Sequence, residues 1–258
     1  MVKQSPFLLN HFYKNYVSSI MRQIFVITLS FASFYLLLAC RKQNIPANYS
    51  MQPQVNNVVY KNYLALGDSY TIGQSVSAIE RFPAQTLNLL SKDSFSFNAP
   101  EYIAVTGWTT RNLITAINSN PPSRATYDFV TLLIGVNNQY QGRSQSEYAI
   151  EFTELLNTAI QYAGNNTKRV AVLSIPDWGV TPFANGRDRA LISSQIDSFN
   201  AINKQIAITK GVNYINITPS TRMAVNDPSL IATDGLHPSG KEYEKWAVLL
   251  AAVMKLVL

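Results

Sequence analysis

The stretch "YLALGDSYTIG", from Tyr63 to Gly73, begins as an apolar run and changes abruptly at Gly-Asp-Ser. Its first part, Tyr63–Leu66, predicts a short buried strand, because aromatic and aliphatic residues follow one another and a glycine ends the run. Ser69 therefore comes just after a strand. A serine in this position can be an ordinary turn residue, part of a phosphate-binding turn, or a nucleophile exposed at the edge of a sheet.

Strand-like and helix-like segments alternate after this stretch. The predicted strands are short and rich in Val, Ile or Leu: Tyr63–Leu66, Tyr102–Val105, Phe129–Ile134, Val170–Ile175 and Val212–Ile217. The predicted helices lie between them: Phe82–Leu90, Thr110–Ile117, Glu147–Tyr162 and Leu191–Thr209. A last helix is expected after Ser239, where Ser-x-x-Glu predicts a capping box. Buried strands separated by helices predict an α/β fold with a doubly wound parallel sheet.

Polar groups follow the predicted strands, and ligands of such sheets bind beyond the carboxyl ends of the strands. Ser69 follows the first strand, Gly107 the second, and the segment "GVNNQ", Gly135 to Gln139, the third. A longer excursion after the fifth strand ends in "DGLHPSG", residues 234–240. Together these segments offer a hydroxyl, a backbone N–H beside a glycine, a side-chain amide and an Asp-His pair, which are groups suited to acyl transfer.

These four segments resemble the marker blocks of the SGNH hydrolases, also called GDSL esterases and lipases. The resemblance runs in order over about Tyr63 to Trp246, and it places the family's functional residues on Ser69, Gly107, Asn137, Asp234 and His237. It implies a three-layer α/β/α sandwich with a five-stranded parallel sheet, flavodoxin-like in architecture. It also implies a serine esterase that needs neither a metal nor an organic cofactor and acts on acyl esters of lipids or acetylated carbohydrates.

The roles of these residues follow from the resemblance and from the chemistry of ester cleavage. Ser69 would be the nucleophile, His237 the base that takes its proton, and Asp234 the group that orients the imidazole. The oxyanion hole would consist of the Ser69 and Gly107 N–H groups and the Asn137 side chain. Glycine at 107 is expected because the absence of a side chain allows close approach of the backbone to substrate.

Two positions depart from the common family pattern, and one carboxylate competes with the assigned triad. Tyr70 stands where leucine is frequent, and Asn138 replaces an aspartate that could brace the loop of Asn137. Asp177, in "IPDWG" after the fourth strand, is a rival acid or, with Trp178, part of the substrate site. An apolar wall is expected from Trp108 and from Pro182-Phe183.

His237 has its own competing interpretation, since a lone histidine is often only a surface residue. The chain has one other histidine, His11, which lies in a segment predicted to be removed. A Ser-His mechanism must therefore use His237. The non-enzymatic alternative is a flavodoxin-like binding lipoprotein that holds a phosphate with Ser69-Tyr70-Thr71. That alternative explains the first motif but not the other three.

The N-terminal part of the chain predicts export. Residues 1–39 combine positive charges, an apolar stretch from Ile24 to Leu38 and a small residue before the expected cut, as in a secretory signal. Leu37-Leu38-Ala39-Cys40 resembles the bacterial lipobox, which implies a lipidated Cys40. Residues 40–61 would then be the lipidated cysteine and a polar tether, and residues 62–258 the hydrolase domain. A plain signal anchor with an incidental cysteine is the alternative.

Composition excludes several other classes of protein. Removal of residues 1–39 takes away Lys3, Lys14 and Arg22 and no acid, so the formal charge falls from +6 to +3. No Lys/Arg cluster is interleaved with aromatic residues, which argues against nucleic-acid binding. A zinc site would have only carboxylates to add to one histidine. From the signal segment and the lipobox resemblance we expect an exported, membrane-anchored lipoprotein in the periplasm or at the cell surface.

Overall fold

The computed structural model describes residues 58–258. The predicted signal segment, Cys40 and most of the predicted tether lie outside the described residues. Residues 58–258 all belong to one compact unit. Its first strand begins at Tyr63 and its last helix ends at Lys255.

The described unit is built on one sheet of five parallel strands. The strands are β1 (Tyr63–Asp68), β2 (Glu101–Val105), β3 (Phe129–Leu133), β4 (Val170–Leu173) and β5 (Asn213–Ile215), in the spatial order β2-β1-β3-β4-β5. In the register of the central strands, Leu66 of β1 lies opposite Ile103 on one side and Leu132 on the other. Every residue of β1, β3 and β4 is buried. This is the flavodoxin-like strand order, and the predicted fold class is confirmed.

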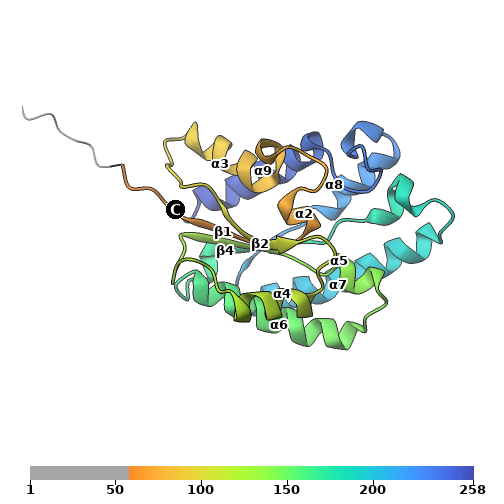
Figure 1. Ribbon diagram of the computed structural model, residues 1–258, viewed down its shortest axis with the longest axis horizontal. Helices are drawn as coiled ribbons and strands as arrows, with labels where there is room; N and C mark the ends of the chain where they lie inside the picture. The colour runs from red at the N-terminus through yellow and green to blue at the C-terminus, as the bar shows by residue number, and fades with distance from the viewer. Residues whose placement is uncertain (1–57) are drawn as a thin grey trace, which may run out of the picture. The chain divides into compact units, whose positions relative to one another are not determined.

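Helices cover both faces of the sheet (Figure 1). On one face lie α3 (Phe82–Ser91) and α9 (Gly240–Lys255); on the other lie α4 (Thr110–Ser119), α6 (Gln145–Tyr162) and α7 (Arg189–Lys210). Each helix turns an apolar stripe inward, as residues three, four and seven apart share a helix face. In α9 the stripe includes Tyr243 and Trp246, whose rings pack against Phe82 of α3 at centroid distances of 6.2 and 5.9 Å.

Three short helices were not expected from the sequence. They are α2 (Ser69–Ile72), α5 (Val136–Tyr140) and α8 (Thr218–Arg222), and they begin just after β1, β3 and β5. Each is only four or five residues long, so it carries too little periodicity to be recognised. Two of them matter for function, because Ser69 begins α2 and Asn137 is the second residue of α5.

Strands β4 and β5 are shorter than predicted, for a reason that lies in side chains. The Ser174 hydroxyl accepts hydrogen bonds from the N–H groups of Ile217 (2.8 Å) and Thr218 (3.1 Å). The N–H of Ile175 donates to Asn200 Oδ1 of α7 at 2.8 Å. The N–H of Ser174 still donates to the carbonyl of Ile215 at 3.0 Å, but the N–H groups of Ile175, Ile217 and Thr218 are satisfied by side chains, so the ladder ends although the apolar sequence continues.

The predicted capping box at Ser239 is wrong in its hydrogen bonds. Ser239 is the residue that precedes α9, but its hydroxyl donates to the carbonyl of Ser229 at 2.7 Å. Glu242 instead accepts a hydrogen bond from Trp246 Nε1 at 2.8 Å. These two residues therefore fasten the start of α9 to the preceding loop and to its own next turn, rather than to each other.

Candidate active site

The predicted site residues gather at the carboxyl edge of the sheet, at the ends of β1 and β3. The chain order reverses between these two strands, since β2 lies on one side of β1 and β3 to β5 on the other. Such a reversal leaves a crevice at the carboxyl ends of the strands, where ligands of open α/β sheets bind. Ser69 and Asn137 follow these two strands, on α2 and α5.

The Gly-Asp-Ser turn fixes Ser69 at the end of β1. A Cβ on Gly67 would lie 2.1 Å from Thr71 Oγ1 and 2.4 Å from the carbonyl oxygen of Leu133, so only glycine fits between α2 and β3. Asp68 precedes α2 as its N-cap, and its Oδ1 accepts the N–H of Tyr70 at 3.0 Å. Asp68 therefore braces the turn that presents Ser69.

Ser69, His237 and Asp234 form a continuous hydrogen-bonded chain. Ser69 Oγ lies 3.0 Å from His237 Nε2, and His237 Nδ1 lies 2.6 Å from Asp234 Oδ2. Ser69 and His237 are 168 positions apart in the chain, and both are 4% exposed. The fold thus joins the first and last of the four predicted blocks at hydrogen-bonding distance.

The Asp234 carboxylate is held by four donors. Its Oδ1 accepts the N–H groups of Leu236 and His237, each at 2.9 Å, and Oδ2 accepts the hydroxyl of Ser75 at 2.7 Å as well as the imidazole. Partial burial raises the pKa of Asp234, but the hydrogen bonds from Ser75, His237 and Leu236 outweigh it and lower this pKa to about 2. Because an ionised carboxylate only accepts, Nδ1 carries the imidazole proton and Nε2 is left to accept the Ser69 proton.

The loop that carries His237 is anchored on both sides. The carbonyl of His237 accepts the N–H of Ala232 at 2.8 Å, and Pro238 pairs with Ile231 in an isolated antiparallel bridge. The ring of Tyr70 packs against the imidazole with 5.0 Å between centroids. Tyr70 therefore acts in packing, as expected when it replaces the more frequent leucine.

The three predicted oxyanion-hole residues follow β1, β2 and β3 at this edge, and their role stays a prediction. Asn137 Nδ2 donates to the carbonyl of Trp108 at 3.1 Å and, more weakly, to Asp68 Oδ2 at 3.4 Å. Gly107 follows β2 with φ of 81°, a left-handed conformation that favours glycine. A Cβ there would meet no heavy atom within 4 Å, so within the chain it is the backbone conformation, rather than crowding, that calls for glycine.

Asn138 is braced from two helices, which answers the question raised by its replacement of an aspartate. Its Oδ1 accepts the N–H of Thr110 at 3.0 Å, and its Nδ2 donates to Thr110 Oγ1 at 2.7 Å. The Thr110 hydroxyl in turn donates to the Glu151 carboxylate of α6. Arg111 Nε donates to the other Glu151 oxygen at 2.8 Å. The carboxylate that braces the Asn137 segment is therefore that of Glu151, which acts through Thr110 on Asn138.

A pocket of about 130 Å³ opens beside Ser69 and His237. Its lining is mainly aromatic and aliphatic: Ser69, Tyr70, Val136, Asn137, Tyr140, Trp178, Phe183, Leu236 and His237. Trp178 is fixed because its indole N–H donates to Gln139 Oε1 at 2.7 Å. Tyr140 and Phe183 are 46% and 41% exposed and form the mouth.

The expected apolar wall is correct in part. Phe183 and Trp178 line the pocket, but Trp108 and Pro182 do not. The sequence analysis missed Tyr140 and Gln139; their position just after Asn137 on a short helix was the only available signal. The Asp177 carboxylate is fully buried and accepts hydrogen bonds from Arg222 Nε (2.8 Å) and the N–H of Gly179 (2.9 Å). It makes no hydrogen bond with His237, so it is a structural acid rather than a rival triad member.

Two further properties concern residues 58–258 only. No three His, Cys, Asp or Glu side chains of this region are grouped so that they could hold a metal ion. Among its helices, none combines the length and apolar character that a bilayer span requires.

Comparisons with known proteins identify the class. Residues 65–245 match the model of the GDSL-like Lipase/Acylhydrolase family, and the chain belongs to this family. No curated protein sequence matches the chain. The protein is an ester hydrolase, as predicted from its four motifs.

Solved structures share the fold at low sequence identity. The lipase Lip_vut3 from a goat rumen metagenome is 20% identical with a TM-score of 0.61, over 75% of this chain and 97% of that one. The lipase/acylhydrolase from Enterococcus faecalis is 18% identical with a TM-score of 0.58, over 76% of this chain and 97% of that one. Axe2, an acetylxylan esterase from Geobacillus stearothermophilus, is 17% identical with a TM-score of 0.57, over 76% of this chain and 95% of that one. These likenesses support the three-layer α/β architecture.

Burial of Asp68 predicts a specific pH dependence of stability. Desolvation raises the pKa of Asp68 to about 7, although the N–H of Tyr70 and the Asn137 amide act to lower it. Between about pH 4 and 7 the folded chain therefore holds a proton that the unfolded chain has lost, so this group's contribution to stability falls as pH rises. From pH 5 to pH 8 the loss should be about 2–3 kcal/mol.

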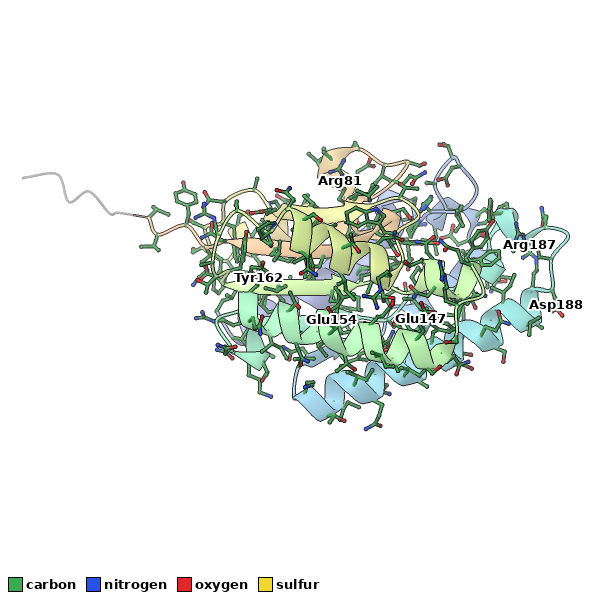
Figure 2. All side chains as sticks on the ribbon, turned by 60° about the horizontal axis from the view of Figure 1, so that its bottom comes forward. Arg81, Glu147, Glu154, Tyr162, Arg187 and Asp188 are labelled. Atoms are coloured by element: carbon green, nitrogen blue, oxygen red, sulfur yellow. The ribbon has the colours of Figure 1, made fainter. Side chains whose placement is uncertain are left out.

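Asp68→Asn should remove this dependence. Urea unfolding at pH 5 and at pH 8 measures the free energy of unfolding of each protein. From pH 5 to pH 8 this free energy should fall by about 2–3 kcal/mol more in wild type than in the variant. Glu154→Gln, at an exposed carboxylate on α6 (Figure 2), is the control and should parallel wild type. Parallel pH curves for wild type and Asp68→Asn would contradict the prediction.

The brace of Asn138 predicts non-additive substitutions. In Asn138→Asp the new carboxylate would share the Thr110 hydroxyl with Glu151, and two buried like charges repel, so the free energy of unfolding at pH 8 should fall by about 3 kcal/mol. Adding Glu151→Gln should restore at least about 1.5 kcal/mol of this loss. Denaturant unfolding of both single variants and the double variant measures the coupling. Purely additive effects would show that the two groups are not linked.

Proposed function

We propose that this protein hydrolyses carboxylic esters through an acyl-enzyme on Ser69, with His237 and Asp234 completing a Ser-His-Asp triad. The observation that carries the proposal is the unbroken chain of contacts, 3.0 Å from Ser69 Oγ to His237 Nε2 and 2.6 Å from His237 Nδ1 to Asp234. The mechanism requires His237 Nδ1 to donate to Asp234 and His237 Nε2 to accept from Ser69, and both contacts allow this. The base accepts at Nε2 because the ionised Asp234 fixes the proton on Nδ1.

In the first half of the reaction, Ser69 Oγ attacks the ester carbonyl and its proton passes to His237 Nε2. The carbonyl oxygen becomes negative in the tetrahedral intermediate. Donors for this oxygen would come from the N–H groups of Ser69 and Gly107 and from the Asn137 amide. The C–O bond to the alcohol then breaks, and the imidazolium returns its proton to the leaving oxygen. The acyl group remains esterified to Ser69.

In the second half, water replaces the alcohol. His237 takes a proton from the water as its oxygen attacks the acyl carbonyl, and the same donors stabilise the second intermediate. Ser69 Oγ leaves and regains its proton from the imidazolium. The products are a carboxylic acid and free enzyme.

The substrates we propose are short acyl esters of lipids or acetylated carbohydrates. The pocket of about 130 Å³ beside Ser69 has room for an acetyl or other short acyl group. Its aromatic lining can pack against the face of a sugar ring or an acyl chain. One structure with this fold is described as an acetylxylan esterase and others as lipases.

The alternative of a non-catalytic phosphate-binding lipoprotein is less well supported. The hydroxyl of Ser69 lies at hydrogen-bonding distance from the His237 imidazole instead of being open to an anion. Phosphate binding also does not explain the contact between Asp234 and His237.

Ser69→Ala should lower kcat/KM for a short-chain ester by about 10⁴-fold or more, because no other group replaces the nucleophile. The thermal midpoint should stay within a few degrees, as one hydroxyl contributes little to the core. Hydrolysis of 4-nitrophenyl acetate and a melting curve provide both measurements. Ser91→Ala, at an exposed serine of α3, is the control. Turnover near wild type in Ser69→Ala would refute the proposed nucleophile.

We also propose that the protein is an exported lipoprotein, with residues 1–39 as signal peptide and Cys40 lipidated. The support is in the sequence: Leu37-Leu38-Ala39-Cys40 follows an apolar stretch, and the next twenty residues are polar with two prolines. The polar segment would act as a tether that connects the anchor to the hydrolase domain at residues 62–258.

Cys40→Ser should move the protein out of the membrane fraction after expression in a bacterial host, because the acyl chains are the anchor. Fractionation with immunodetection measures the shift, and labelling with radioactive palmitate should be lost in parallel. The kcat/KM for 4-nitrophenyl acetate should match that of wild type. A variant that stays membrane-bound and needs detergent for extraction would favour an uncleaved signal anchor.

A further inference from the structure

Arg187 lies in the exposed loop that leads into α7 (Figure 2). Its guanidinium carbon is 5.3 Å from the ring centroids of Tyr140, Trp178 and Phe183. All three rings line the pocket beside Ser69. The positive charge is therefore placed against the wall along which an ester would lie.

Contacts with neighbouring side chains restrain the Arg187 side chain. Its Nη2 donates to the hydroxyl of Tyr140 at 3.3 Å. The rings beneath it pack on one another, with Tyr140 5.4 Å from Trp178 and Phe183 5.9 Å from Trp178 between centroids. Within residues 58–258 the guanidinium makes this one hydrogen bond, to Tyr140, so its other N–H groups can bind a ligand. An oxyanion can then bind two of them without displacing the rings.

No carboxylate of residues 58–258 forms an ion pair with Arg187. The adjacent Asp188 instead caps α7, where its Oδ1 accepts the N–H of Leu191 at 2.9 Å. The next arginine, Arg189, is bonded away from the pocket, to Asn185 Oδ1 and the Thr181 carbonyl. The charge of Arg187 thus remains uncompensated at the pocket mouth.

We propose that Arg187 is a specificity-determining residue that binds a carboxylate or phosphate group carried by the substrate, so that the enzyme prefers anionic esters. The inference rests on the proposed esterase function and deepens it. An ester with its carbonyl at Ser69 and its body along the aromatic wall brings its far end to Arg187. Binding there stabilises ground state and transition state alike, so the effect falls mainly on KM.

The test compares esters that differ only in charge. For an anion on the acyl side, the pair is 4-nitrophenyl hydrogen glutarate and 4-nitrophenyl pentanoate. For an anion on the alcohol side, 4-acetoxybenzoate is compared with its methyl ester, and 4-acetoxyphenyl phosphate provides a phosphate. Wild type should hydrolyse the anionic member of at least one pair with the lower KM, and added salt should reduce this preference because the site is exposed.

Arg187→Gln should lower the ratio of kcat/KM between the anionic and the neutral ester about tenfold, as expected for one charge-assisted hydrogen-bonding group. Arg187→Lys keeps the charge but not the planar fork, so its ratio should lie between the other two. Arg189→Gln is the matched control for loss of a neighbouring positive charge, and it should keep the wild-type ratio.

The outcomes separate the inference from the function on which it rests. Ser69-dependent hydrolysis with no preference for the anionic ester, or with a ratio unchanged in Arg187→Gln, would overturn the inference alone. An equal fall of the ratio in Arg187→Gln and Arg189→Gln would also overturn it, because the effect would then be general electrostatics. Absence of Ser69-dependent hydrolysis of every ester would overturn the proposed function and the inference together.

Discussion

The site depends on the lack of space around Gly67. No Cβ fits there, because Thr71 of α2 and the backbone of β3 both approach within contact distance. This close packing brings the end of β1 against the end of β3, so that the turn after one strand and the helix after the other meet at a single edge. Asp68 then caps α2 and accepts the Asn137 amide, which links the two strand ends directly. Ser69 takes its place from this arrangement.

A second constraint acts on the partner of Ser69, which comes from the other end of the domain. Bringing together groups 168 positions apart costs conformational entropy, which the core repays during folding rather than during the reaction. Locally, Asp234 folds its own loop by accepting two backbone N–H groups, and the Ser75 hydroxyl ties that loop to the segment after α2. The imidazole thus approaches Ser69 from a loop whose shape is already fixed by hydrogen bonds.

Sequence patterns predicted what depends on local periodicity and failed where distant side chains decide. The five strands are short apolar runs and the long helices are periodic apolar patterns. Three of the four motifs closely follow β1, β2 and β3, so a parallel sheet brings them to one edge, and the fourth ends the longer segment after β5. Ser174 and Asn200 end β4 early through side chains that no apolar run reveals. Glu151 supplies the carboxylate that Asn138 lacks, but it does so through Thr110, which lies 28 positions from Asn138 and 41 positions from Glu151. Tyr140, at the end of α5, and Arg187, in the loop before α7, meet only because the fold brings these two segments together.

Asp68 shows how stability and the proposed chemistry oppose each other in one side chain. Ionising a fully buried carboxyl costs free energy because the charge loses its hydration, and this desolvation raises the pKa of Asp68 to about 7. The same shift limits the negative charge beside Asn137, where a full charge would repel the oxyanion that the proposed mechanism forms. An asparagine at this position would avoid the burial cost, but its amide would point a donor at the Asn137 amide and lose the acceptor that orients it. With a pKa of about 7 the carboxyl is half ionised at neutral pH, so both the stability cost of burying it and its repulsion of that oxyanion grow as pH rises.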